Sequence, residues 1–376
     1  MHRPIRRREF TAGLALLALS GGCSSPGDTG AGSDKIVIGM AGPLSGAQTF
    51  QGEYILNAVR IAVDEVNTKG GIQGKMVEVV SGDDGAEPRQ AVIVAQKMVS
   101  TEGLLGLVGH FNSGCSIPAS QIYSRGKLTM ITPGSTNPKL TAQGLKNVFR
   151  VVFRDDQQGP VSGEFALKVL GAKRIAILQD KTAYGEGLAG FFRKAVEAGG
   201  AEVIFYEGVT PGDKDFRAVL TKIRGGNPDV VFFGGYYPEA GPLLLQARQL
   251  GIKVPFLCGD GVKEQTFLQT VGAQTANIYV SGPAEVNNAA FVSTYKSRYK
   301  EAPGPFAPYS YDATRILLAA IAASDLTRES VLTEVSKTKD FPGLAGPINF
   351  TKDGDVVDAP VQVFVIKDGN FVPYKA

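Results

Sequence analysis

Short hydrophobic runs alternate with amphipathic segments along this chain. The first run, Lys35 to Met40, precedes a segment in which Ile55 and Val59 recur at helical spacing until Gly70 ends it. Further strand-like runs lie at 76–80, 104–108 and 128–131, with predicted helices between them at 88–99 and up to residue 124. Such alternation predicts an α/β fold in which helices cover both faces of a parallel sheet.

A second, similar series follows the first. It has predicted strands at 148–153, 174–178, 203–206, 229–233 and 254–257, and predicted helices through 165–169 and at 191–198. Gly109 and Pro133, at two strand ends of the first series, are 24 residues apart, and Gly234 and Gly259 of the second are 25 apart. Each spacing equals one βα unit, so each half places two neighbouring strand ends at a crevice. We therefore predict two lobes that face each other across a cleft, followed by helices at 291–299 and 314–323 and strands at 361–366 and 371–374.

The first 33 residues have the pattern of an export segment. Arg7-Arg8-Glu9-Phe10 resembles the twin-arginine motif, and the apolar run 12–19 is too short to span a bilayer. Cys23 follows small residues, as at a bacterial lipoprotein cleavage site, and 24–32 is typical of a flexible tether. We expect residues 1–22 to be an export signal, 23–33 a lipidated tether and Cys23 the lipid attachment residue. The alternative is an ordinary secretory signal that is cut elsewhere. The expected location is the periplasm or the outer face of the cell membrane.

Charge and cysteine content argue against some classes of function. The segment before Cys23 holds four arginines and one glutamate of the 39 basic and 36 acidic residues, which leaves 35 of each in the mature chain. A neutral chain offers no basic surface for nucleic acid. The remaining cysteines, Cys115 and Cys258, lack the spacing of a metal or redox motif, so we expect them to pack as small apolar groups and expect neither a metal nor a cofactor.

The polar residues at the predicted strand ends suit a zwitterion with an apolar side chain. Ser113 and Thr136 offer hydroxyls near free backbone N–H groups for a carboxylate, and Asp260 offers a negative charge for an ammonium. Phe111, Tyr184 and Tyr236 offer aromatic surface. An alternative for Asn112 and Ser113 is that they only cap the following helix.

Six ordered blocks resemble the leucine/isoleucine/valine-binding proteins of bacterial ABC transporters. The blocks are IVIGMAGPLSG at 36–46, NTKGGIQG at 67–74, residues 109–120, TPGSTNPKL at 132–140, DKTAYGEGLA at 180–189 and GGYYPEAG at 234–241. The similarity begins at about residue 34 and extends almost to the end of the chain, including GPINFTKDG at 346–354. The resemblance implies a type I periplasmic binding fold, with two Rossmann-like lobes joined by a three-strand hinge. The N-terminal lobe would comprise 34–153 and 282–351, and the C-terminal lobe 154–281 and 352–376. A monomer would close around one amino acid, branched-chain or otherwise aliphatic, and deliver it to a membrane permease and its ATPase.

The resemblance also implies roles for individual residues. Ser113 and Thr136 fall where the family binds the α-carboxylate, and Gly134 where a backbone carbonyl meets the ammonium. Tyr236 and Asp260 fall at cleft positions of the second lobe, and Tyr184 at its aromatic contact. Phe111, Asn112, Ser135 and Gln51 complete the expected ligand-binding set. The chain departs from the family in three ways: Asp260 replaces a glutamate, Gln51 or Phe50 replaces a tyrosine, and Ala86 and Asn112 stand where some members have a disulfide.

Two other functions compete with solute delivery. Gly185 to Gly190 matches the dinucleotide fingerprint of an NAD-dependent oxidoreductase, but Gln179 to Tyr184 separate it from the preceding strand, which places its glycines inside a helix. A hydrolase is disfavoured because there is no Gly-x-Ser-x-Gly and the one mature histidine, His110, is expected to pack at the cleft floor. We therefore expect no catalytic residues. A receptor subunit of the same fold that senses an amide or a small carboxylate remains an alternative.

Overall fold

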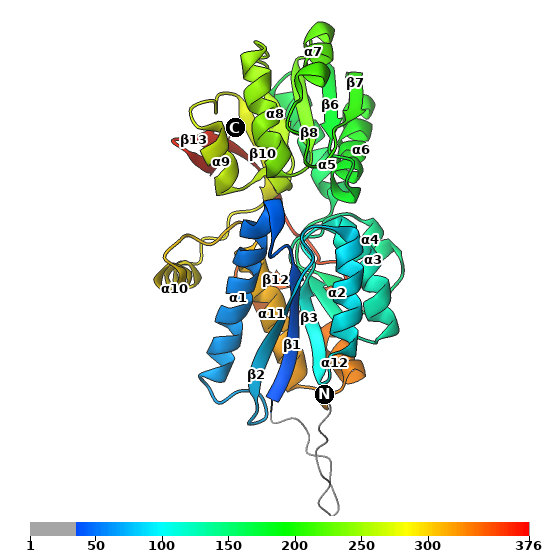
Figure 1. The fold of residues 1–376 in the computed structure, drawn as a ribbon, viewed down its shortest axis with the longest axis vertical. Helices are drawn as coiled ribbons and strands as arrows, with labels where there is room; N and C mark the ends of the chain where they lie inside the picture. The colour runs from blue at the N-terminus through cyan, green and yellow to red at the C-terminus, as the bar shows by residue number, and fades with distance from the viewer. Residues whose placement is uncertain (1–34, 376) are drawn as a thin grey trace, which may run out of the picture. The chain divides into compact units, whose positions relative to one another are not determined.

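The computed structural model of the protein describes residues 35–375. The predicted export signal, Cys23 and the tether lie outside this range. The described part contains two β-sheets with helices on both faces, which confirms the α/β prediction (Figure 1).

The first sheet has five parallel strands in the order β2-β1-β3-β4-β5. Their bounds are β1 Lys35–Gly42, β2 Met76–Asp83, β3 Leu104–Gly109, β4 Thr129–Thr132 and β5 Val148–Arg150. β3 and β4 are buried along their whole length, as expected of apolar runs inside a parallel sheet. β5 ends three residues before the predicted limit, because the chain turns at Arg150 towards the second sheet.

Helices cover both faces of the first sheet. On one face lie α1 Thr49–Asn67, which follows the short helix η1 Gly46–Gln48, together with α11 Ala307–Ala322 and α12 Arg328–Ser336. On the other lie α2 Pro88–Ser100 and α3 Ser113–Arg125 (Figure 1). The short α4 Lys139–Ala142 follows β4, and α10 Ala289–Tyr299 contacts α1. The apolar residues of α1 recur at helical spacing because one face of the helix packs on the sheet. Ile55 and Val59 lie on that face and are fully buried.

The second sheet has seven strands in the order β14-β13-β10-β9-β8-β6-β7. The parallel strands are β6 Arg174–Gln179, β7 Glu202–Gly208, β8 Val230–Gly234, β9 Phe256–Cys258 and β10 Ile278–Pro283, and the antiparallel ones are β13 Val361–Lys367 and β14 Asn370–Pro373. The parallel strands repeat the order of the first sheet, which explains the matching spacing of polar strand ends in the two halves of the sequence.

The helices of the second sheet divide in the same way between its faces. One face carries α5 Asp155–Glu164, its continuation η2 Phe165–Val169, and α6 Ala183–Ala198. The other carries α7 Arg217–Gly226, α8 Tyr237–Gln249 and α9 Gln265–Val271, with η3 Asp260–Val262 after β9. Gly185, Gly187 and Gly190 lie within α6, so the fingerprint-like glycines are helical, as predicted.

The chain passes between the two sheets at three places. It leaves the first sheet after β5, returns after β10, and leaves again after the small hairpin of β11 Phe341–Gly343 and β12 Gly346–Ile348. The residue limits of the two lobes given above stay a prediction. Within residues 35–375, no helix is long and apolar enough to cross a bilayer. The two cysteines of this part are free and buried, which confirms that they pack as small groups.

Candidate functional site

The predicted site residues lie at the carboxyl ends of parallel strands, where α/β sheets bind ligands. Ser113 begins α3, and the loop of Gly134 to Thr136 follows β4. In the second lobe, Tyr184 lies in the first turn of α6, Tyr236 is the N-cap of α8, and Asp260 begins η3. Ser113, Tyr184, Tyr236 and Asp260 are therefore positioned by the start of a helix and Thr136 by the loop after β4, and all five are buried.

Aromatic rings from both lobes meet at this site. The ring centroid of Phe111 lies 6.2 Å from that of Tyr236 and 5.0 Å from that of Phe306, and Tyr236 lies 4.9 Å from Tyr184. Gly134 packs directly on Phe111, because a Cβ at residue 134 would collide with the Phe111 ring. Phe306 was missed by the sequence reasoning, since it lies in a loop far from the predicted strand ends.

Tyr184 holds Asp260 in place. Its hydroxyl donates to Oδ1 of Asp260 at 2.7 Å and accepts from the backbone N–H of Gly261 at 3.1 Å. Burial raises the pKa of Asp260 to about 6, and the hydrogen bond from Tyr184 opposes this shift. Asp260 is thus a buried acid whose charge has no cation in direct contact among the described residues.

A second buried acid, Asp155, lies close to Asp260. It is the first residue of α5 and is 0% exposed, and neither of its carboxyl oxygens has a hydrogen bond of normal geometry among residues 35–375, although the Thr136 hydroxyl lies near it. Burial, followed by the charge of Asp260, raises its pKa well above the usual range, and the Thr136 hydroxyl and the charge of Arg150 oppose this. Two such carboxyls side by side favour a bound cation. Sequence reasoning missed Asp155 because an acid in the first turn of a helix is common. The available signal was its position shortly after the strand predicted at 148–153.

The hydroxyls that we predicted for a carboxylate differ in their contacts. Thr136 Oγ1 is buried and lacks a hydrogen-bond partner within the described range, whereas Ser113 Oγ accepts from the backbone N–H of Asn137 at 3.2 Å. Ser135 is used differently, because its hydroxyl is 2.6 Å from Ser116 Oγ and donates to the Phe111 carbonyl. Ser113 and Ser135 therefore hold the loop through hydrogen bonds, whereas the Thr136 hydroxyl makes no such bond within the described range.

The two remaining candidates lie towards α1. Asn112 donates through Nδ2 to Gln48 at 2.7 Å, and its Oδ1 has no partner in the described residues. Gln51 is 2% exposed, neither of its amide atoms has a hydrogen bond of normal geometry, and its amide lies near the carboxyl of Glu264.

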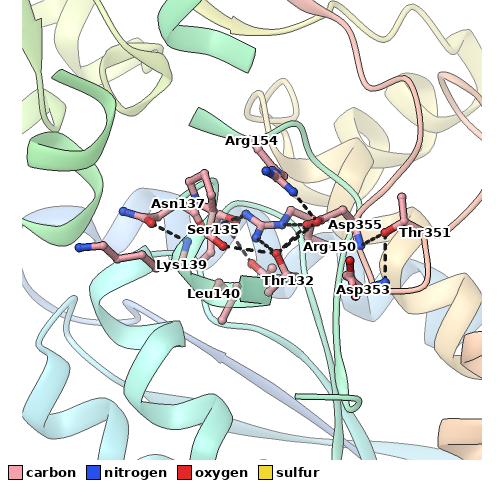
Figure 2. Close-up of polar contacts among 12 residues, drawn as sticks. Thr132, Ser135, Asn137, Lys139, Leu140, Arg150, Arg154, Thr351, Asp353 and Asp355 are labelled. Atoms are coloured by element: carbon pink, nitrogen blue, oxygen red, sulfur yellow. Dashed lines mark hydrogen bonds and ion pairs between the residues drawn. The ribbon is translucent and has the colours of Figure 1, made fainter. Parts of the chain in front are cut away.

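A buried arginine holds the loop that carries Thr136, as Figure 2 shows. Arg150 donates through Nη1 to the carbonyls of Ser135 at 2.9 Å and Asn137 at 3.1 Å. Its Nε lies 2.6 Å from Oδ1 of Asp355, which belongs to the last crossing between the sheets. Arg154 also reaches Asp355, at 2.9 Å. One ion-pair cluster therefore joins a hinge segment to the ligand loop.

His110 has a packing role, as predicted. It is 0% exposed, with Nδ1 2.6 Å from Asp84 and Nε2 2.8 Å from the Tyr123 hydroxyl. Both ring nitrogens are occupied by buried partners, so the imidazole has no free nitrogen for a substrate.

Comparison with known proteins identifies the family of this chain. The family model described as periplasmic binding protein matches residues 35–370. The chain belongs to this family. It is 37% identical to an amino acid binding protein of Pseudomonas aeruginosa over 93% of this chain and 94% of that protein. It is 38% identical to Leu/Ile/Val-binding protein homolog 2 of Brucella abortus, over 89% and 91%.

Solved structures of the periplasmic binding protein family have the same fold. A leucine binding protein from Thermotoga maritima is 32% identical with a TM-score of 0.84, over 90% of this chain and 98% of its own. A branched-chain amino acid transporter substrate binding protein from Streptococcus pneumoniae, in complex with isoleucine, is 30% identical with a TM-score of 0.83, over 90% and 100%. The family and the type I fold predicted from the sequence blocks are confirmed. The named relatives are binding proteins.

Proposed function

We propose that this chain is the extracytoplasmic solute-binding component of an ABC importer and that its ligand is an amino acid with an aliphatic, for instance branched, side chain. The observation that carries the proposal is the pair of buried acids, Asp155 and Asp260, next to the unpaired hydroxyl of Thr136. An ammonium meets the two acids and a carboxylate meets Ser113 and Thr136. The names of the relatives support an amino acid as the ligand.

Each part of the ligand has a matching surface. The carboxylate binds the hydroxyls of Ser113 and Thr136 at the start of α3, where free N–H groups favour an anion. The ammonium binds Asp260, Asp155 and the Gly134 carbonyl. The side chain packs on the rings of Phe111, Tyr184, Tyr236 and Phe306, with Asn112, Ser135 and Gln51 at the edge of the first lobe.

Ligand binding favours lobe closure because its contacts come from both lobes. Ser113 and Thr136 follow strands of the first sheet, whereas Tyr184, Tyr236 and Asp260 follow strands of the second. A ligand that contacts both groups stabilises the closed arrangement by contacts that the open one lacks. The closed monomer then delivers the amino acid to the permease and its ATPase, tethered to the membrane by a lipid on Cys23.

Calorimetric titration of the mature protein tests this function. Co-purified ligand is first removed by unfolding and refolding, and the protein is then titrated with amino acids, amides, organic acids and NAD(H). We expect one-to-one binding of an aliphatic amino acid with micromolar or tighter affinity. Binding of only an amide or an organic acid would contradict the ammonium site, and binding of only NAD(H) would contradict the solute-binding role.

Replacement of Tyr184 by phenylalanine is expected to weaken amino acid binding about tenfold, since one hydrogen bond to a charged partner contributes about 1.5 kcal/mol. The variant keeps the ring against Tyr236 and removes only the donor to Asp260. Calorimetry measures the change. Tyr279→Phe is the matched control, because Tyr279 lies on β10 and packs on Phe165. Equal amino acid affinities of Tyr184→Phe and Tyr279→Phe would show that the Tyr184 hydroxyl does not contribute to binding.

Amino acid affinity is also expected to rise with pH through the pKa of Asp260. This pKa is about 6 in the folded protein, so below that pH the carboxyl must lose a proton before it pairs with an ammonium. Affinity should fall about tenfold per pH unit below about pH 6 and level off above it. Titrations in buffers of different ionisation enthalpy should show proton release, and Asp260→Asn should weaken this dependence, leaving only the part due to Asp155. A flat profile between about pH 5 and pH 7 would contradict the role of Asp260.

A further inference from the structure

One cavity lies at the edge of the candidate site, next to Gln51. Its volume is about 620 Å³, within the range of small-molecule sites. Its walls come from α1, the segment 263–269, the crossing 284–287, the loop 301–305 and the start of β14. It therefore has walls from both lobes and from one hinge crossing, and none of the proposed amino-acid contacts lines it.

The cavity contains a buried acid without a compensating cation. Glu264 lines it, is 2% exposed, and its Oε1 has no hydrogen-bond partner among the described residues. Burial raises the pKa of Glu264 to about 8, while the nearby Gln51 amide and the charge of Lys263 oppose the shift. Neither amide atom of Gln51 has a normal hydrogen bond within the described range. Such unsatisfied buried groups are costly unless a ligand pairs with them.

The surrounding ionisable groups are mostly acidic. Burial, followed by the charges of Glu264, Glu301 and Glu53, raises the pKa of Tyr54, so three carboxyl groups lie near its hydroxyl. Lys263 does not neutralise them, because its Nζ donates to the Pro283 carbonyl at 3.1 Å and lies 3.4 Å from the ring centroid of Phe364. The other basic residue on the wall, Lys296, is exposed on α10.

Aromatic side chains complete the wall. Phe50, Tyr54 and Phe371 line the cavity, and Phe50 is 48% exposed, which is unusual for a large apolar side chain. Carboxylates combined with aromatic faces are the chemistry that binds organic cations, through ion pairs and cation–π contacts. An anion would meet the acidic side chains of Glu264 and Glu301 in the cavity wall, and a purely apolar ligand would leave Glu264 unpaired.

We propose that this cavity is a second binding site for a small organic cation with an ammonium or guanidinium group, held by Glu264 and the Phe50 and Tyr54 rings. Since its walls come from both lobes, an occupant contacts groups whose separation changes on closure. Binding there is thus coupled to amino acid affinity, and the coupling is reciprocal. The contacts proposed for the cation, Glu264 and the rings of Phe50 and Tyr54, are separate from those proposed for the amino acid.

The probe for this site is agmatine, which carries a guanidinium and an ammonium group, and the test is calorimetric titration of the mature protein. We expect one-to-one binding that Glu264→Gln weakens at least about tenfold, the loss expected for one charge-assisted contact. Asp260→Asn, which disables the proposed amino acid site, should leave agmatine binding unchanged. Glu207→Gln is a surface control on β7, and thermal melting checks that each variant is folded.

Three results would overturn the second site. They are no agmatine binding at millimolar concentration, equal binding by wild type and Glu264→Gln, or loss of binding in Asp260→Asn with retention in Glu264→Gln. The last would place the cation in the main cleft. If amino acids fail to bind while agmatine binding depends on Glu264, the proposed transport function fails and the cation site stands.

Discussion

Replacement of Arg150 by methionine is expected to lower the free energy of unfolding by about 3 to 5 kcal/mol, the usual cost of leaving one member of a buried ion pair alone. Arg150 is 0% exposed and is paired with Asp355, which the variant would leave buried. The carbonyls of Ser135 and Asn137 would lose their donor as well. Urea-induced unfolding, followed by circular dichroism, measures the loss.

Arg174→Met is the matched control for this variant. Arg174 also pairs with a carboxylate, Glu202, at 2.7 Å, but both side chains are about half exposed. Exposed pairs contribute about 1 kcal/mol or less, so the control should unfold nearly as the wild type does. A double variant, Arg150→Met with Asp355→Leu, should regain part of the stability because no lone charge stays buried. If Arg150→Met and Arg174→Met lose similar amounts, Arg150 does not hold the ligand loop and the hinge together.

Local patterns in the sequence were enough to predict the strand ends and their chemistry. Apolar runs such as Leu104 to Val108 are typical of a strand buried on both faces, and polar residues that follow such strands lie at the crevice of a parallel sheet. Ser113, Tyr184 and Asp260 could be placed by that logic. The hydrogen bond between Tyr184 and Asp260 could not, because it depends on how two neighbouring strand ends are spaced in the sheet.

Features that depend on chain crossings could not be predicted. Asp155 follows the first crossing, so its proximity to Asp260 depends on how α5 packs on the second sheet. Asp355 reaches Arg150 only because the last crossing runs beside β5, with a bridge between these two residues. The Ser135 hydroxyl contacts Ser116 of α3, because the loop after β4 packs against the first turn of that helix and both serines are buried there. No local pattern encodes such distant contacts.

Asp155→Asn is expected to change ligand affinity and stability in opposite directions. Without the carboxylate, the amino acid's ammonium loses a charged partner, and affinity should fall by about 2 kcal/mol or more, roughly thirtyfold. The ligand-free protein should become more stable. The pKa of Asp155 is higher in the folded protein than in the unfolded chain, so its carboxyl favours folding at low pH. This contribution is lost as the pH rises from the pKa of the unfolded chain through that of the folded protein. The gain from asparagine should therefore be smallest at low pH and should grow as pH rises.

Two measurements test this pair of effects: calorimetric titration of the amino acid, and thermal melting of the ligand-free protein at several pH values. Asp156→Asn is the control, because Asp156 is half-buried and bonded to Arg154, and it should change neither quantity much. If Asp155→Asn lowered stability and left affinity unchanged, Asp155 would only stabilise the start of α5. Lower affinity together with higher stability means that the folded protein maintains an unpaired acid at a cost in stability. An unpaired acid of this kind binds an ammonium more tightly than one already paired within the protein.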